Sequence, residues 1–359
     1  MALLLMMMAA MPSYPQKIYA AISESEKSKF QYHVMHESNM WKLPDGYFFN
    51  AQATSPIDYS SNSVYSLITN GLGKSTLVMK DDKIIKDLKA LLPNWINNGG
   101  SINALKVIRD TIYLAGTGYC SSPGRKSESY AFYWRLANGS ISTFCPTLSH
   151  KEPNSESHET AYAIAVKGED VYLATCKTYG WKLGVPSRRE IVVYKNGDIL
   201  YTNDLYATDI SITGIGVTDH CTYVTGSYFN KNERSRSIPL LLKNGIKCDI
   251  TETGIYAFKG IAVANNAIYC VAQSSDGKAW IWSDNGLSKG LQLFDIKFHT
   301  KYSISSIYVD AHDTIYLGGN VTASGSNISK AIIWRSDGYP LWISQNDNKS
   351  SNVISFIIK

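Results

Sequence analysis

The segments Ile315-Tyr-Leu-Gly-Gly319 and Ala331-Ile-Ile-Trp-Arg-Ser-Asp-Gly338 contain the pattern that decides the fold. In the first, a hydrophobic residue followed by tyrosine begins a β-rich run. In the second, an apolar run ends in Asp-Gly, a dipeptide that favours a hairpin turn because Asp, Asn and Gly tolerate positive φ. Together they predict two strands joined by a loop, with a hairpin after the second strand.

The hydrophobic-tyrosine pair recurs along the whole chain at intervals of 46 to 59 residues. Further alternating runs, such as Phe258 to Val263, come before most of the pairs. Each unit therefore contains four expected strands: an alternating strand A, the tyrosine strand B, a strand C that ends at Asn-Gly or Asp-Gly, and a short outer strand D. Four-stranded units of this length are typical of propeller blades. The repeated tyrosines are Tyr19, Tyr65, Tyr113, Tyr172, Tyr223, Tyr269 and Tyr316.

The first tyrosine strand has no strand A before it, whereas residues 351–358 have strand A character and nothing after them. We therefore expect an all-β fold, a seven-bladed β-propeller over residues 16–359. Its ring would close when residues 351–358 complete blade 1, which leaves no exposed sheet edge there. Blade 2 is the irregular member, because residues 84–92 also have the apolar spacing of a short helix. The alternative is six blades and an irregular insertion.

Over residues 16–359 the chain resembles the broad superfamily of β-propeller repeat proteins, particularly those with recurring Val-Tyr-x-x-Gly and Trp-Lys-Asn-Gly elements. It carries variants of these elements, such as Ile315-Tyr-Leu-Gly-Gly319 and Tyr194-Lys-Asn-Gly197. The resemblance implies the fold and leaves the activity open, since propellers include enzymes, lectins and scaffolds. The Gly-His and Trp-Asp signature of WD40 repeats is absent, and so is a kelch double glycine in every blade. We expect the repeated tyrosines to pack between blades.

Composition fits a globular protein, with 44% hydrophobic and 18% charged residues. A net charge of +5 is modest for 359 residues, so it does not indicate a strong attraction to nucleic acid or membranes. The apolar run from Met1 to Met11 is too short to span a bilayer, so we expect no transmembrane segment. Residues 1–15 are interpreted as a disordered leader or a weak signal-like segment. We expect a soluble monomer, and the cytoplasm is slightly favoured over secretion.

The motifs that could carry chemistry fail on spacing. Gly71-Leu-Gly-Lys-Ser-Thr76 is similar to the end of a phosphate-binding loop, but Ile68 occupies the place of the required first glycine. His33 and His36 would point to opposite faces of a strand, and no third metal ligand is evident. The six cysteines also lack metal-binding spacing. We therefore expect no cofactor and no metal site, and we assign no catalytic residue.

The loops that join strands B and C emerge on one face and combine basic with aromatic side chains. Such loops commonly carry binding residues, and exposed Arg with Tyr or Trp is the composition of interface hot spots. The same face also has acids such as Glu24 and Glu159, so ordinary solvated loops are the alternative interpretation. The candidate binding residues are Tyr119, Arg125, Tyr179, Trp181, Arg188, Arg189, Tyr228, Arg234 and Arg236.

These features together predict a non-enzymatic platform that binds a protein partner through the B–C loops. A carbohydrate-binding propeller is the first alternative, although loops that differ between blades argue against a symmetric lectin. A glycoside hydrolase or lyase is the second, and it would need two acids that converge near the axis. Nucleic acid is not expected as a partner, because the net charge is modest. The acids expected near the axis are scattered singly, at Asp204, Asp209, Asp249, Glu252 and Asp295.

Overall fold

The structure is a computed structural model, and the elements that it describes are all β-strands. Among the described residues there is no helix with the length and hydrophobicity that crossing a bilayer requires. The described residues are 16–26, 29–37, 39–49, 54–70, 76–88, 99–120, 128–146, 157–182, 185–230, 236–250, 254–284, 290–294, 301–323, 325–345 and 348–359.

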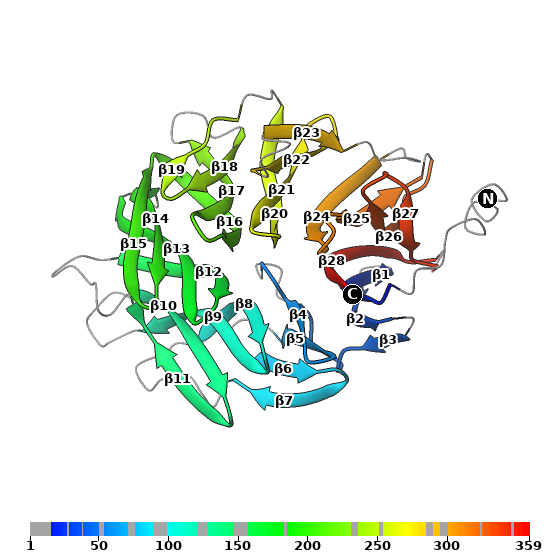
Figure 1. Cartoon of the computed structure of the whole chain (residues 1–359), viewed down its shortest axis with the longest axis horizontal. Helices are drawn as coiled ribbons and strands as arrows, with labels where there is room; N and C mark the ends of the chain where they lie inside the picture. The colour runs from blue at the N-terminus through cyan, green and yellow to red at the C-terminus, as the bar shows by residue number, and fades with distance from the viewer. Residues whose placement is uncertain are drawn as a thin grey trace.

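The described strands form sheets that are arranged around a common centre, and the fold is therefore all-β and propeller-like (Figure 1). The first sheet has the order β28–β1–β2–β3, with β28 (Ser350–Ile358), β1 (Ile18–Glu26), β2 (Lys29–His36) and β3 (Asn39–Lys42). The second contains β4 (Ile57–Ser60), β5 (Ser63–Thr69), β6 (Thr76–Lys80) and β7 (Lys83–Asp87).

The next sheet along the chain has eight strands, because two groups of four are joined by one parallel contact between Ser129 and His158. The first group is β8 (Gly100–Ile108), β9 (Thr111–Cys120), β10 (Glu128–Ala137) and β11 (Ser140–Phe144). The second group is β12 (Ser157–Lys167), β13 (Asp170–Lys182), β14 (Val185–Lys195) and β15 (Asp198–Leu205).

Three further four-stranded sheets follow, again with strands in chain order. One contains β16 (Ala207–Val217), β17 (Thr222–Asn230), β18 (Ser237–Lys243) and β19 (Ile246–Lys247). The next contains β20 (Ile255–Ala264), β21 (Ala267–Ser274), β22 (Ala279–Ser283) and β23 (Gly290–Phe294). The last contains β24 (Lys301–Val309), β25 (Ile315–Thr322), β26 (Ser329–Arg335) and β27 (Pro340–Ile343).

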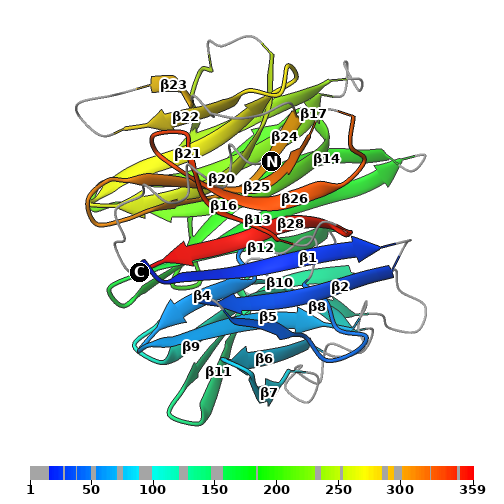
Figure 2. The same cartoon turned by 90° about the vertical axis from the view of Figure 1, so that its right-hand side faces the viewer.

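The two ends of the described chain meet in one sheet. Strand β28 lies beside β1 (Figure 2), and Ile357 is paired with Tyr19. Lys17 and Lys359 exchange backbone N–H···O hydrogen bonds of 2.8 and 3.0 Å. Residues 351–358 therefore pair with the strand that the sequence predicts. In the second sheet, residues 83–87 form β7 and not a helix, whereas residues 89–92 lie outside the described residues.

The repeated tyrosines are buried, with at most 8% of each side chain exposed. The Tyr65 hydroxyl donates to Asp110 Oδ1 at 2.8 Å, in the β8–β9 turn of the next sheet. The Tyr269 hydroxyl donates to Asp313, also in the next sheet, at 2.9 Å. The tyrosines thus connect one sheet to its neighbour, which confirms that they pack between units.

Strand A of most sheets contains a β-bulge, which is one extra residue at the same register each time. Sequence reasoning missed this feature. The extra residue displaces the backbone of strand A toward strand B. A Cβ on Gly319 would lie 1.9 Å from the backbone oxygen of Ser303, and Gly226 has the same position in its own sheet. The bulge therefore accounts for glycine three positions after the tyrosine at Gly226 and Gly319, whereas Ile22 and Thr175 occupy this position in two other strands. Bulged residues are Asn103, Tyr162, Thr213, Lys259, Ser305 and Ile354.

Several bulged side chains also hydrogen-bond to the neighbouring inner strand. Asn103 Nδ2 donates to the Ala161 carbonyl oxygen at 2.6 Å, although only 1% of the residue is exposed. The Thr213 hydroxyl donates to the Phe258 carbonyl oxygen at 3.2 Å. These bonds hold neighbouring inner strands together and satisfy backbone groups that would otherwise face the centre.

The six cysteines all lie within the described residues and form no disulfide. Cys176 and Cys270 are buried, and burial raises the pKa of the Cys176 thiol to about 12. Since the thiolate is the reactive form, we expect both thiols to resist iodoacetamide in the folded protein and to react in denaturant. Peptide mass spectrometry measures this. Labelling of Cys176 as fast as that of half-buried Cys120 in the folded protein would contradict the expectation.

Candidate functional site

The hairpin of β13 and β14 contains the main group of expected binding residues that the structure brings together. With 13 residues, β13 is the longest of the described strands. Tyr179 is paired with Arg188 across the hairpin. The Tyr179 ring centroid lies 5.0 Å from the Arg188 guanidinium and 4.9 Å from Lys177 Nζ. Both distances allow favourable cation–π contact.

Two acids fix this pair of side chains. Arg188 Nε donates to Asp204 Oδ2 at 2.7 Å, and this hydrogen bond raises the pKa of Arg188 above its ordinary value. Glu190 accepts from the Tyr179 hydroxyl at 2.8 Å and from Arg188 at 3.4 Å. The Arg188 side chain still has 47% of its surface exposed. We call Tyr179, Arg188, Glu190 and Asp204 the Tyr179 cluster.

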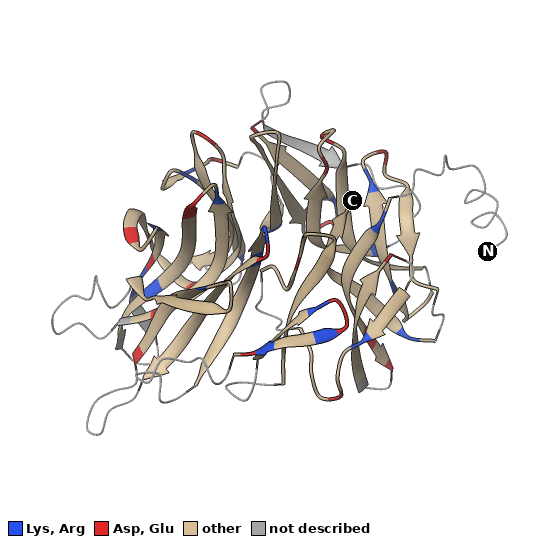
Figure 3. Cartoon of the chain, turned by 60° about the horizontal axis from the view of Figure 1, so that its bottom comes forward, with Lys and Arg blue, Asp and Glu red and all other residues tan. Residues whose placement is uncertain are grey.

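The cluster is not the basic patch that the loop composition suggests, because its arginine is matched by two carboxylates. Arg189, the next residue, also pairs with an acid: its guanidinium donates to Asp209 Oδ1 at 2.9 Å. In Figure 3, basic residues (Lys and Arg) and acidic residues (Asp and Glu) are both spread among the sheets. The surface around the cluster therefore has mixed charge, with an aromatic ring at its centre.

The other candidates have different positions. Tyr119, at the end of β9, is 36% exposed, and Arg236 is exposed just before β18. The backbone of Trp181 pairs with that of Pro186 near the end of the hairpin, and the Trp181 side chain is not among those that the structure describes. Arg125 and Arg234 lie outside the described residues.

Three residues that sequence reasoning places on this face are instead buried. Tyr228 is 7% exposed and belongs to a core cluster, where its hydroxyl accepts from Lys247 Nζ at 2.7 Å. Glu159 is fully buried and accepts from the Tyr194 hydroxyl at 3.2 Å. Glu24 is 7% exposed. Strand alternation turns these side chains inward, which loop composition alone does not reveal.

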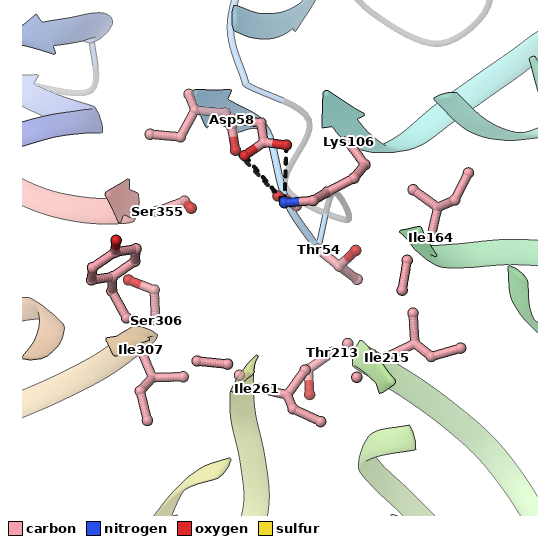
Figure 4. A pocket seen from close by; sticks show the side chains of 18 of the residues that line it. Thr54, Asp58, Lys106, Ile164, Thr213, Ile215, Ile261, Ser306, Ile307 and Ser355 are labelled. Carbon is pink, nitrogen blue, oxygen red and sulfur yellow. Dashed lines mark hydrogen bonds and ion pairs between the residues drawn. The ribbon is translucent and has the colours of Figure 1, made fainter. Parts of the chain in front are cut away.

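A cavity of about 1350 Å³ occupies the centre of the molecule. It is bordered by the inner strands β4, β8, β12, β16, β20, β24 and β28 (Figure 1). Each inner strand contributes residues in a similar register, so isoleucines recur around the wall (Figure 4). The recurring isoleucines are Ile164, Ile215, Ile261 and Ile307, each paired with the residue that follows a repeated tyrosine.

One ion pair interrupts the apolar part of the wall (Figure 4). Lys106 Nζ lies 3.1 Å from Asp58 Oδ2 and 3.3 Å from Oδ1. Asp58 also accepts from the backbone N–H groups of Val107, at 2.6 Å, and Tyr59, at 2.9 Å. The Asp58 side chain is 11% exposed and that of Lys106 is 38% exposed. The aspartate is thus enclosed by donors, whereas the ammonium group faces open space.

Asp58 and Lys106 occupy equivalent positions of adjacent inner strands, opposite Tyr65 and Tyr113. Sequence reasoning missed them, although a charged residue seven positions before a repeated tyrosine is a usable signal. Elsewhere around the centre this position is apolar or aromatic. Its other occupants are Ala165, Gly216, Ala262, Tyr308 and Ile357.

The described aspartates of the cavity lining all have cationic partners. Besides Asp58 with Lys106, Asp219 lies 2.5 Å from Lys167 Nζ, and Asp209 pairs with Arg189. Glu252 and Asp295 are outside the described residues, and Asp249 is exposed. Within the described part of the chain, the cavity wall has no two unpaired carboxylates that converge.

The two histidines of β2 have separate environments. His33 Nε2 lies 3.4 Å from Glu24 Oε2, and burial lowers the pKa of His33 below its ordinary value. His36 stacks on Trp41, with 4.7 Å between ring centroids. No group of three His, Cys, Asp or Glu side chains in the described ranges is placed to hold a metal ion.

No family model and no curated protein sequence matches the chain. Among solved structures, a mutant puromycin hydrolase complexed with PGG is similar at 10% identity and a TM-score of 0.56, covering 93% of this chain and 53% of that one. A second puromycin hydrolase structure has 9% identity, a TM-score of 0.55, and coverages of 96% and 52%. This chain thus spans about half of puromycin hydrolase.

The β-propeller domain of Cps50 (Swd1) from Myceliophteria thermophila has 10% identity and a TM-score of 0.45, covering 84% of this chain and 96% of that domain. The two puromycin hydrolase structures lie at identities where only the fold can be compared. They assign no activity, substrate or partner to this chain.

Proposed function

We propose that the sheets are the blades of one closed seven-bladed propeller, in which β28 completes the first blade. The pairing of β28 with β1 supports ring closure. The division of the eight-stranded sheet into two groups that share a single bridge supports counting it as two blades. The tyrosine contacts between neighbouring sheets are consistent with a continuous ring.

We further propose that the protein is a non-enzymatic binding platform for a protein partner, and that the Tyr179 cluster is the centre of the binding surface. The observation that carries the proposal is the fixed Tyr179–Arg188 pair on the longest described hairpin. Tyrosine and arginine dominate interface hot spots. Side chains already held in place also lose less conformational entropy on binding.

The alternatives have less support. Hydrolysis of a glycosidic bond needs two carboxylates placed about the bond, whereas each described aspartate of the cavity wall is paired with a cation. A symmetric lectin would repeat its pocket, but among the described residues a tyrosine stacked on an arginine is found on this hairpin alone. The mixed charge around the cluster is also poorly suited to nucleic acid, which favours a basic groove.

Photo-crosslinking tests the location of the surface. A benzophenone amino acid at Tyr119, on the same face as the cluster, is expected to capture a discrete partner from cells that express the protein. The same probe at Ile246, which is 74% exposed on β19, serves as the control. Equal capture of the same partner at both positions would place binding elsewhere.

The captured partner then allows an affinity measurement. We expect Arg188→Ala to weaken binding about 10- to 30-fold, the effect of losing a contact worth about 1.4 to 2 kcal/mol. Arg335→Ala is the matched control, because Arg335 also donates to a carboxylate, Asp337, but lies at the β26–β27 turn. Surface plasmon resonance measures both. An unchanged affinity of Arg188→Ala would contradict the proposal.

A further inference from the structure

We propose that the central cavity is a binding site for a small molecule with a carboxylate or phosphate group, which is held by the Lys106 ammonium. This site is separate from the Tyr179 cluster and does not depend on the protein-binding proposal. A cavity of about 1350 Å³ is large enough for a small metabolite.

The first step of the argument is the placement of Lys106. Its side chain extends from β8 into the cavity, and it is 38% exposed (Figure 4). An ammonium group has three donors and no acceptor. Asp58 holds the group from one side, at 3.1 and 3.3 Å, so the remaining donor capacity is directed at the cavity. The ion pair therefore fixes the position of the cation.

The second step is the saturation of Asp58. Its Oδ2 accepts from Val107 N–H and from Lys106, and its Oδ1 accepts from Tyr59 N–H and from Lys106. A ligand hydroxyl or amine would have to displace one of these donors. The pair thus offers a ligand donors and not acceptors, and a ligand oxygen with negative charge is the matching group.

The third step is the charge of the wall. Lysines outnumber aspartates four to three among the described lining residues, and each of the three aspartates has a cationic partner. Hydroxyl groups of Ser306 and Ser355 line the same space and could donate to further ligand oxygens (Figure 4). The lining side chains therefore carry a small positive excess, which suits an anion better than a cation.

The fourth step is the departure from the repeat. Five of the inner strands have an apolar or aromatic residue where Asp58 and Lys106 stand, so the fold does not need charge at this register. The nearly buried Asp58 accepts from the Val107 N–H of β8, and this structural contact does not require Lys106. A role in binding explains why the two charges occur together, in adjacent strands, beside an open cavity.

Isothermal titration calorimetry with inorganic phosphate, citrate and sorbitol tests the site. We expect saturable binding of phosphate, of citrate or of both, and a comparison of the two affinities shows whether the site prefers phosphate or carboxylate. We expect no binding of uncharged sorbitol. Lys106→Met should weaken anion binding at least about tenfold. Lys195→Met is the control, because Lys195 is similarly exposed and pairs with an aspartate, Asp170, but does not line the cavity, and its effect should stay within about threefold.

Lys106→Met leaves Asp58 without its counter-ion, so we also use the double variant Asp58→Asn, Lys106→Met. Its melting temperature, compared with that of the wild type, shows whether it folds. We expect the double variant to fold and to fail to bind the anion. A second measurement uses the wild type alone: the bound anion should protect Lys106 from acetic anhydride, with exposed Lys42 as the internal standard. The proposal is overturned by binding of sorbitol alone, by no saturable anion binding, or by full anion affinity in the double variant.

Discussion

Replacing Gly319 with alanine is expected to destabilise the folded protein by about 3 kcal/mol, the upper end of the cost of overpacking. The new Cβ would lie 1.9 Å from the backbone oxygen of Ser303, far inside contact distance. Because the obstructing atom belongs to the backbone of a bulged strand, no side-chain rotation can relieve the clash. Urea unfolding followed by tryptophan fluorescence measures the change in free energy of unfolding.

Gly260→Ala is the matched control, since Gly260 lies beside the equivalent bulge of β20. There the added Cβ would meet the Ile307 side chain at 3.3 Å, which a shift of a few tenths of an ångström accommodates. We expect a loss below about 1 kcal/mol. Equal destabilisation by both substitutions would show that the bulge carbonyl is not what requires glycine at position 319.

The sequence was sufficient to predict features that depend on local pairing. Hydrophobic-tyrosine pairs and Asn-Gly turns specify antiparallel strands, and their spacing implies repeated four-stranded sheets. The partner of residues 351–358 was also predictable, because the first tyrosine strand lacks an inner neighbour. In the second sheet, the apolar spacing of residues 84–92 also suited a short helix. Residues 83–87 nevertheless form an outer strand.

The features that escaped depend on contacts between strands that the sequence pattern does not specify. The bulge at Asn103 has no side-chain signature of its own, because asparagine, threonine, tyrosine and lysine all occur at this register. The partners of Arg188 lie on two strands, and one of them, Asp204, was assigned to the axis. The Asp58–Lys106 pair joins residues 48 positions apart, which only the packing of adjacent inner strands brings into contact.

Tyr223→Ala is expected to lower the free energy of unfolding by about 3 to 5 kcal/mol, as for other large buried aromatic residues. Tyr223 is fully buried and its ring contacts Trp282 of the next sheet, with 5.8 Å between centroids. Its hydroxyl donates to Asp284, which also accepts from the Ile268 N–H at 2.8 Å and so anchors β21. Burial raises the pKa of Tyr223, so the phenol stays protonated and able to donate at neutral pH.

Tyr223→Phe separates the two contributions, because it keeps the ring and removes only the hydroxyl. We expect a loss of about 1 to 3 kcal/mol, since Asp284 would retain its backbone donor but lose a charge-assisted hydrogen bond. Arg188→Ala should change stability by less than about 0.5 kcal/mol, because Arg188 is exposed and its ion pair with Asp204 is solvated. Thermal and urea unfolding of the three variants give this order directly. If Arg188→Ala were the most destabilising, the Tyr179 cluster would be a structural element and the tyrosine contacts would not be what joins the sheets.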